Sequence, residues 1–140
     1  FGGDGTVDSS ADIRNKFIEN GIKWFSENPI LGYGINNYKE LNGPATGRFT
    51  YAHNNFVELA VDLGVVGLIF YYSVYIYLIV KLFKLIKKEP LSVFALAALI
   101  TSLISHYGNV SYYDLYQNFL LFLCFLTIEK AQEEELNNKS

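Results

Sequence analysis

The sequence predicts an all-α membrane protein fragment with three transmembrane helices, preceded by an extracytoplasmic loop that carries one or two amphipathic surface helices. Hydrophobic residues make up 51% of the chain of 140 residues, and beyond residue 64 they gather in three blocks. Each block approaches the roughly 20 mainly apolar residues that a spanning helix needs. The first and second blocks are separated by a cluster of four lysines, Lys81, Lys84, Lys87 and Lys88.

The lysine cluster also orients the predicted spans. Loops rich in Lys remain in the cytoplasm, so the link between the first two spans is expected inside. We therefore predict an extracytoplasmic loop at residues 1–63, spans at about 64–86, 91–107 and 112–128, and a cytoplasmic tail at 129–140. A soluble protein with three buried core helices is the alternative, which block length and charge placement disfavour. The chain has no Met and starts without a signal peptide, so we expect it to be the C-terminal part of a larger polytopic protein.

Charge and residue usage exclude some classes of function. The formal net charge is −3, and the basic residues do not gather into the surface that nucleic-acid binding requires. The chain has no Asp-x-Asp pair, so no cation site is predicted. Its single cysteine, Cys124, permits no intrachain disulfide and is expected to be a small buried side chain. His106, at the outer end of the second span, is predicted to be an interfacial polar residue.

The first amphipathic helix is predicted from about Ser9 to Glu27. Ser9 followed by Asp12 resembles a capping box, and Asn28-Pro29 ends the helix because a residue before proline avoids the helical region. Apolar side chains recur every three or four positions (Ile13, Phe17, Trp24 and Phe25 among them). Such a helix is expected to lie flat on the membrane with its aromatic side down.

The segment after this helix is predicted to be irregular up to a second helix. Residues 30–34 form a tight turn, and residues 36–48 carry the turn signals Gly43-Pro44 and Gly47. The second helix is expected to start near His53-Asn54, with Asn54 as its N-cap. Apolar positions between residues 56 and 63 form one face of it, and Glu58 and Asp62 lie on the polar face. A bend is expected at Gly64 and Gly67, where this helix passes into the first span, and a continuous helix is the alternative.

Three side chains on the outer side of the membrane are candidates for chemistry: Arg14, Arg48 and His53. Arginine is always charged and offers a fork of donors that matches phosphate oxygens. Histidine exchanges a proton near neutral pH more readily than other side chains. Two arginines and a histidine in one loop beside a bilayer would suit a phosphate-linked lipid substrate. On composition alone, solvated loop arginines without a chemical role are the alternative, and the more common case.

The order of the motifs resembles the C-terminal region of the O-antigen ligase and polymerase superfamily, bacterial polytopic membrane proteins that transfer or polymerise lipid-linked glycans. Arg14 is followed by a Pro29-x-x-Gly32-x-Gly34 turn, then by His53-Asn54, and then by a helix that ends in Gly64-x-x-Gly67. The resemblance covers about Arg14 to Phe70. The family's tryptophan one turn after the arginine is absent, and Phe17 or Ile18 stands in its place.

This resemblance implies a role for each matching residue. Arg14 would hold the diphosphate of a polyprenyl-diphosphate-linked oligosaccharide, and His53 would orient or deprotonate the acceptor hydroxyl. Arg48 and Tyr33 would contact substrate, and Asn54 would orient His53 or cap the helix. No metal and no other cofactor is implied. The implied partners are the lipid-linked oligosaccharide, a glycan acceptor, the lipid bilayer, a flippase and a chain-length regulator.

The resemblance indicates a glycan polymerase or ligase of bacterial cell-surface polysaccharide synthesis (O-antigen, capsule or exopolysaccharide). The protein is expected to be a multi-pass protein of the inner membrane, and polymerisation is preferred over ligation. The alternative is a non-enzymatic membrane module of a transporter or polysaccharide-assembly complex, in which Arg14 and His53 are structural. Substituting these two residues discriminates between the hypotheses.

Overall fold

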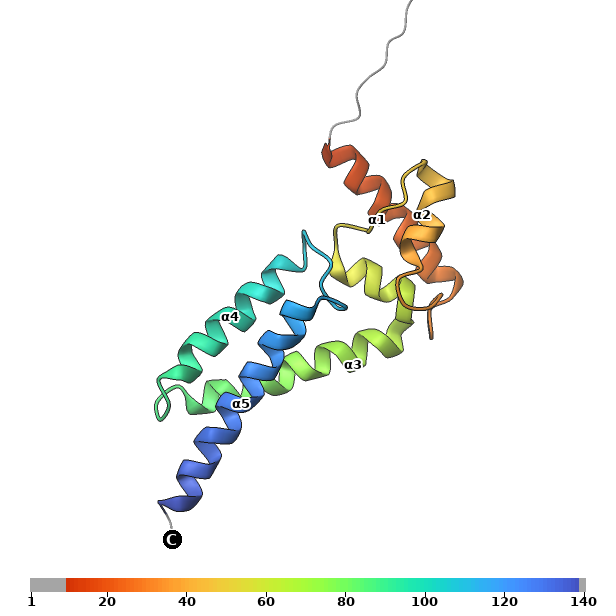
Figure 1. Ribbon diagram of the computed structural model, residues 1–140. Helices are drawn as coiled ribbons and strands as arrows, with labels where there is room; N and C mark the ends of the chain where they lie inside the picture. Colours follow the sequence, from red (N-terminus) through yellow and green to blue (C-terminus); the bar gives the residue numbers. More distant parts are fainter. Residues whose placement is uncertain (1–9, 139–140) are drawn as a thin grey trace, which may run out of the picture.

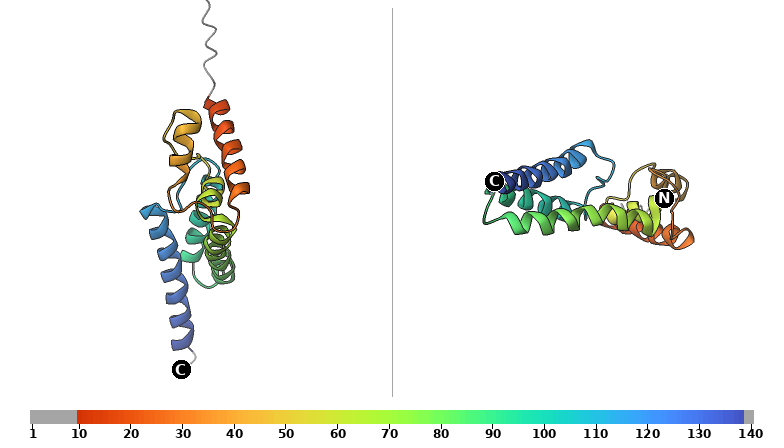
Figure 2. Two further views of the ribbon diagram at one scale, coloured as in Figure 1. Left: turned by 90° about the vertical axis from the view of Figure 1, so that its right-hand side faces the viewer. Right: turned by 90° about the horizontal axis from the view of Figure 1, so that it is seen from below.

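The computed structural model describes residues 10–138, which form five helices and no strand: α1 (Ser10–Glu27), α2 (Tyr38–Thr46), α3 (Asn55–Leu85), α4 (Leu91–Ser105) and α5 (Leu115–Asn137). The all-α prediction is confirmed for this part of the chain. Figure 1 shows α1 and α2 gathered beside the start of α3, while α4 and α5 run along the rest of it. We call α1, α2 and the start of α3 the outer group, and the rest of α3 with α4 and α5 the bundle. The two further views in Figure 2 show the same division. Ser9, the proposed capping residue, lies outside the described residues.

The bundle is held by apolar contacts among the second part of α3, α4 and α5. Its buried core consists of Tyr75, Leu78, Leu82, Leu99, Leu121, Cys124 and Ile128. The outward surface is also apolar: Phe70 is 73% exposed, Phe94 72% and Leu115 78%. Large exposed apolar areas mark contact with a membrane or with another protein. The bundle therefore has a core within and a second apolar surface around it.

Among the described helices, α3 is long and apolar enough to cross a bilayer, judged by length and composition. The helix α4 is apolar but has 15 residues. The arrangement with three spans and its topology thus stay predictions. The part of α3 beyond Gly64 corresponds to the first predicted span.

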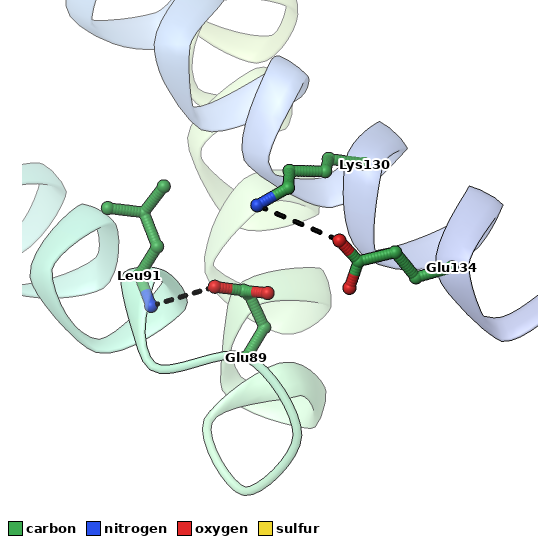
Figure 3. A network of polar contacts seen from close by, with 4 residues as sticks. All are labelled: Glu89, Leu91, Lys130 and Glu134. Atoms are coloured by element: carbon green, nitrogen blue, oxygen red, sulfur yellow. Dashed lines mark hydrogen bonds and ion pairs between the residues drawn. The ribbon is translucent and has the colours of Figure 1, made fainter.

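The lysine-rich link lies at the end of the bundle opposite α1 and α2 (Figure 1). Just before α4, Glu89 Oε1 accepts a hydrogen bond from the Leu91 amide at 3.1 Å (Figure 3). On the neighbouring α5, Lys130 pairs with Glu134 at 3.7 Å (Figure 3). Exposed pairs of this kind contribute about 0–1 kcal/mol each, so the apolar core and not these charges holds α5 in place.

His106 lies inside the bundle, so the expectation of an interfacial side chain was wrong. It is fully buried at the end of α4. Its Nδ1 lies 3.3 Å from the Tyr72 hydroxyl, and its Nε2 lies 3.4 Å from the Tyr75 hydroxyl. Tyr75 also accepts a hydrogen bond from Gln117 of α5 at 2.7 Å, so the hydroxyl of this tyrosine faces the other helices of the bundle. The ring is buried because these tyrosines supply the polar partners that a buried imidazole needs.

The outer group has its own aromatic core, formed by Phe17, Trp24, Tyr38, Ala52 and Val61. The rings of Trp24 and Tyr38 meet edge to face at 5.4 Å, and the Tyr38 hydroxyl donates to the Phe17 carbonyl at 2.7 Å. The aromatic side of α1 therefore packs against α2 and α3. The prediction that this aromatic side faces the membrane was wrong, because α2, the segment before α3 and the start of α3 cover it.

The helix α2 replaces part of the segment predicted as irregular. Its N-cap residue Asn37 makes no side-chain capping bond. Asp62 of α3 instead accepts from the main-chain amides of Asn36 at 2.7 Å and Tyr38 at 2.8 Å. Pro44 lies near the end of α2, and Gly47, with φ 74°, ends the helix in the left-handed conformation. The sequence signals for turns therefore mark where α2 ends, while its start is capped by a distant residue.

The bend predicted at Gly64 is confirmed and has a specific construction. Gly64 has φ 63° and ψ −165°, which interrupts α3. In a continuous helix the amides of residues 65 and 66 would bond to the carbonyls of residues 61 and 62. Here the turn at residues 29–34 supplies all four missing partners. The bonds are Tyr33 N to Val61 O (2.9 Å), Gly34 N to Asp62 O (2.7 Å), Val65 N to Pro29 O (2.8 Å) and Val66 N to Ile30 O (3.3 Å).

We call this arrangement of Gly64 with the turn at residues 29–34 the Gly64 joint. A Cβ on Gly64 would collide with the main chain at Ile30, and a Cβ on Gly32 would collide with the main chain at residues 61 and 62. Both glycines also have positive φ. They are required because two main chains meet here without room for side chains. The joint sets the angle between the outer group and the predicted span.

Candidate functional site

A pocket of about 410 Å³ lies between α1 and the segment that joins α2 to α3. Its lining residues are Ser10, Ile13, Arg14, Phe17, Arg48, Phe49, Thr50 and His53. We call it the Arg–His pocket. The fold thus brings together the three candidate residues Arg14, Arg48 and His53, which come from two segments more than thirty positions apart in the chain.

His53 stands in the turn before α3. Its backbone is left-handed, with φ 55°, a conformation that costs a residue with a side chain about 1–2 kcal/mol. The His53 ring stacks on Phe17, with centroids 6.2 Å apart and planes 6° apart, and meets the Tyr51 ring at 4.1 Å. Asn54 caps α3, because its side chain accepts a hydrogen bond from the Val57 amide at 3.1 Å. Of its two implied roles, capping is the one that the hydrogen bonds show.

The Arg–His pocket is electropositive. Two guanidinium groups and no carboxylate are among its lining residues, and arginine stays charged at any physiological pH. Burial, and secondly the positive charge of Arg14, lower the pKa of His53 from its ordinary value of 6.5. His53 is therefore neutral at neutral pH and can accept a proton, while the arginines attract an anion.

Glu58 supports the segment that carries His53, a role that the sequence did not indicate. Its Oε2 accepts from the Ala52 amide at 2.6 Å, and its Oε1 accepts from the Tyr113 hydroxyl at 3.4 Å. Glu58 is 1% exposed, so placing it on a polar helix face was wrong. Burial first, and then the charge of Asp62, raise the pKa of Glu58 to about 7. It is a buried acid that titrates in the physiological range.

Asp62 is a second buried carboxylate in α3, and for it too the polar-face prediction was wrong. Besides capping α2, it accepts a hydrogen bond from the Tyr112 hydroxyl in the link between α4 and α5. Burial raises its pKa, although the hydrogen bonds from Tyr112 and from the amides of Tyr38 and Asn36 act in the opposite direction. The spacing of Glu58 and Asp62 by four residues, which places both carboxylates on one face of α3, was the sequence feature that could have indicated their shared surroundings. Their burial follows because α3 starts at the centre of the outer group, with elements packed all around it.

Asn55 joins the outer group to the bundle. Its main-chain amide donates to the His106 carbonyl at 2.8 Å. Its side-chain Oδ1 accepts from the main-chain amides of Ser111 and Tyr112 at 2.8 and 2.9 Å. These three hydrogen bonds therefore join the start of α3 to the link between α4 and α5. The sequence contains no signal for this contact beyond an asparagine beside a predicted cap.

Two of the predicted site residues do not line the Arg–His pocket. The Tyr33 hydroxyl donates to Glu27 at 2.8 Å, and its amide belongs to the Gly64 joint. Asn54 is engaged as a helix cap. Within residues 10–138, no three His, Cys, Asp or Glu side chains gather as a metal site would need. The chemical roles of Arg14, Arg48 and His53 stay predictions that their shared pocket makes geometrically possible.

Comparison with known protein families gives a match over the first half of the chain. A family model described as O-antigen ligase matches residues 3–72 of the 140. The matched segment includes α1, α2, the Gly64 joint and the lining of the Arg–His pocket. No curated protein and no solved structure matches the chain.

Proposed function

The chain belongs to the O-antigen ligase family, and from this premise we propose that it transfers oligosaccharide from a polyprenyl-diphosphate carrier to a glycan acceptor. The family places the protein among membrane proteins of polysaccharide synthesis, with lipid-linked oligosaccharide and glycan acceptor as substrates. The observation that carries the proposal is the pocket in which Arg14, Arg48 and His53 meet. Two exposed cations that line the same pocket as a neutral imidazole suit a diphosphate leaving group and a hydroxyl nucleophile.

The arginines act on the leaving group. The acceptor hydroxyl oxygen attacks the anomeric carbon of the donor sugar, and the bond from that carbon to the diphosphate oxygen breaks. Both electrons of the broken bond leave with polyprenyl diphosphate, whose charge increases. Arg14, aided by Arg48, binds that charge with charge-assisted hydrogen bonds, which are stronger in the transition state than in the ground state.

His53 acts on the nucleophile. It takes the proton of the acceptor hydroxyl as the new glycosidic bond forms, and it releases the proton to water afterwards. General base catalysis of this kind contributes about 10²–10⁴-fold to a rate. The lowered pKa keeps His53 in the neutral form that this step requires. Its contacts with Phe17 and Tyr51 hold the ring toward the pocket.

The membrane setting completes the proposal. The part of α3 beyond Gly64, α4 and α5 span a bacterial inner membrane, with the Arg–His pocket on the outer side and the lysine link in the cytoplasm. The exposed apolar surface of the bundle and the position of the lysines at its far end support this placement. The reaction is a metal-independent glycosyl transfer in O-antigen, capsule or exopolysaccharide synthesis, with polymerisation preferred over ligation. A flippase and a chain-length regulator are the proposed protein partners.

The test substitutes the pocket residues in the whole protein as its host makes it. Arg14→Ala and His53→Asn are expected to lower polymer amount at least about 10²-fold at equal protein level. Asparagine tolerates the left-handed backbone at position 53, so a loss in His53→Asn reports the missing base and not strain. Lys23→Ala removes an exposed cation of α1 outside the pocket and is the matched control. Normal polymer length and amount in both pocket variants would show that the residues are structural and would overturn the proposal.

A further inference from the structure

A second pocket, of about 560 Å³, lies between the segment that carries His53 and the link between α4 and α5. Tyr51 lines it from the first segment, and Asn109, Tyr113 and Asp114 line it from the link. Ser105 at the end of α4 and Tyr116 at the start of α5 complete this side of the lining. We call it the tyrosine pocket. The Tyr51 ring lies 4.1 Å from the His53 ring, so the tyrosine pocket meets the Arg–His pocket at this pair.

The two pockets differ in the chemistry of their linings. The Arg–His pocket has two arginines and no carboxylate, whereas the tyrosine pocket has the carboxylate of Asp114 and no Lys, Arg or His among its lining residues. An anionic ligand therefore has no cationic partner in the tyrosine pocket. Its three tyrosine rings and its amide, hydroxyl and carboxylate groups suit a neutral ligand with many hydroxyls and an apolar ring face. A sugar has both features.

The walls of the tyrosine pocket are fixed to the element that positions His53. The Tyr113 hydroxyl donates to Glu58 at 3.4 Å, and Asp114 caps α5 by accepting from the Tyr116 amide at 2.7 Å. The link itself is held by the side chain of Asn55 at the start of α3. A site whose walls are held in this way does not have to be ordered when the ligand binds. Its distance to His53 is also set by the fold.

We propose that the tyrosine pocket binds the neutral terminal sugar of the glycan acceptor. The sugar packs its apolar face on Tyr116 and bonds its hydroxyls to Asn109 and Asp114, and a further hydroxyl reaches His53 past Tyr51. The inference rests on the proposed function, because it assigns the acceptor of the same reaction. It divides the site into an anion-binding half for the carrier and a sugar-binding half for the acceptor.

The test measures two ligands separately on the purified whole protein. The first probe is the neutral oligosaccharide released by mild acid from the host's own lipid-linked repeat, and the second is polyprenyl diphosphate alone. Tyr116→Ala and Asn109→Ala, both at exposed positions, are expected to weaken oligosaccharide binding about tenfold, the loss expected for one central contact. Neither variant is expected to change polyprenyl diphosphate binding. Tyr116→Phe keeps the ring and should bind like the wild type, and Leu115→Ala is the matched control at the neighbouring exposed position.

Unchanged oligosaccharide binding in both variants would overturn the inference. So would an equal loss of both probes, because the tyrosine pocket would then not be a separate site. Arg14→Ala serves as the reciprocal variant and should lose polyprenyl diphosphate while keeping the oligosaccharide. If Arg14→Ala keeps both polyprenyl diphosphate binding and transfer, the proposed function fails, and the oligosaccharide results still decide on the tyrosine pocket.

Discussion

Glu58→Gln is expected to abolish a pH dependence in the stability of the segment that carries His53. Glu58 is buried and its pKa is raised from 4.5 to about 7, chiefly by burial and then by Asp62. The bonds from Ala52 and Tyr113 and the charge of Lys39 act against this rise. A glutamine keeps a carbonyl oxygen for the Ala52 amide, but it has no charge to bury.

The direction and the size of this pH dependence follow from the linkage between proton binding at Glu58 and the opening of the segment. The folded state keeps the proton on Glu58 up to about pH 7, whereas the opened segment releases it near pH 4.5. Stability of the closed segment is therefore unaffected below pH 4.5 and falls as pH rises between these two values. A difference of about 2.5 pKa units corresponds to roughly 3 kcal/mol, or about two orders of magnitude in the opening equilibrium.

Hydrogen exchange of the peptide that contains Ala52 measures this opening. After correction for intrinsic exchange, protection in the wild-type protein is expected to fall between about pH 5 and about pH 7, and Glu58→Gln should remain flat. Glu40→Gln removes an exposed carboxylate of α2 and should retain the wild-type slope. Parallel curves for wild type and Glu58→Gln would refute the assignment of a raised pKa to this side chain.

Three further outcomes are expected. Arg14→Gln removes a positive charge beside His53, so the pKa of His53 rises toward 6.5 and the acid limb of kcat/KM moves to higher pH; an unmoved limb would mean that another group titrates. Gly64→Ala places a side chain against the Ile30 carbonyl at a backbone conformation that costs about 1–3 kcal/mol, so the melting temperature of the whole protein falls. Gly108→Ala, whose added Cβ would come no closer than 4.0 Å to the Ser105 carbonyl oxygen, should melt like the wild type. Extensive treatment with a chelator should leave glycan transfer unchanged, and a loss restored by a divalent cation would contradict metal independence.

Much of the fold could be predicted because its signals are local. The end of α1 before Pro29, the cap of α3 at Asn54 and the bend at Gly64 each depend on residues within one or two turns. Hydrophobic periodicity indicated α1, and the length of the apolar blocks indicated the segments of the bundle, for the same reason. The convergence of Arg14 and His53 was expected from the family resemblance and not from any local pattern.

The rest depends on contacts between distant residues. The start of α2 is capped by Asp62, which lies 24 positions after Tyr38, and no pattern within residues 36–48 could indicate it. Glu58 looked solvent-exposed because acidic residues on a short helix usually face water. Its burial is a consequence of Tyr113, the Ala52 amide and the surrounding helices closing over it. The tyrosine pocket escaped prediction because Tyr51 and the residues around the link between α4 and α5 are distant in the sequence and meet only in the fold.

The Gly64 joint has a consequence for the order in which the protein assembles. The turn at residues 29–34 leaves the ribosome before residues 61–66, yet its main-chain partners exist only once Gly64 has been synthesised. The turn therefore cannot reach its final conformation during its own synthesis. Its four main-chain bonds form only after residues 61–66 have also been synthesised.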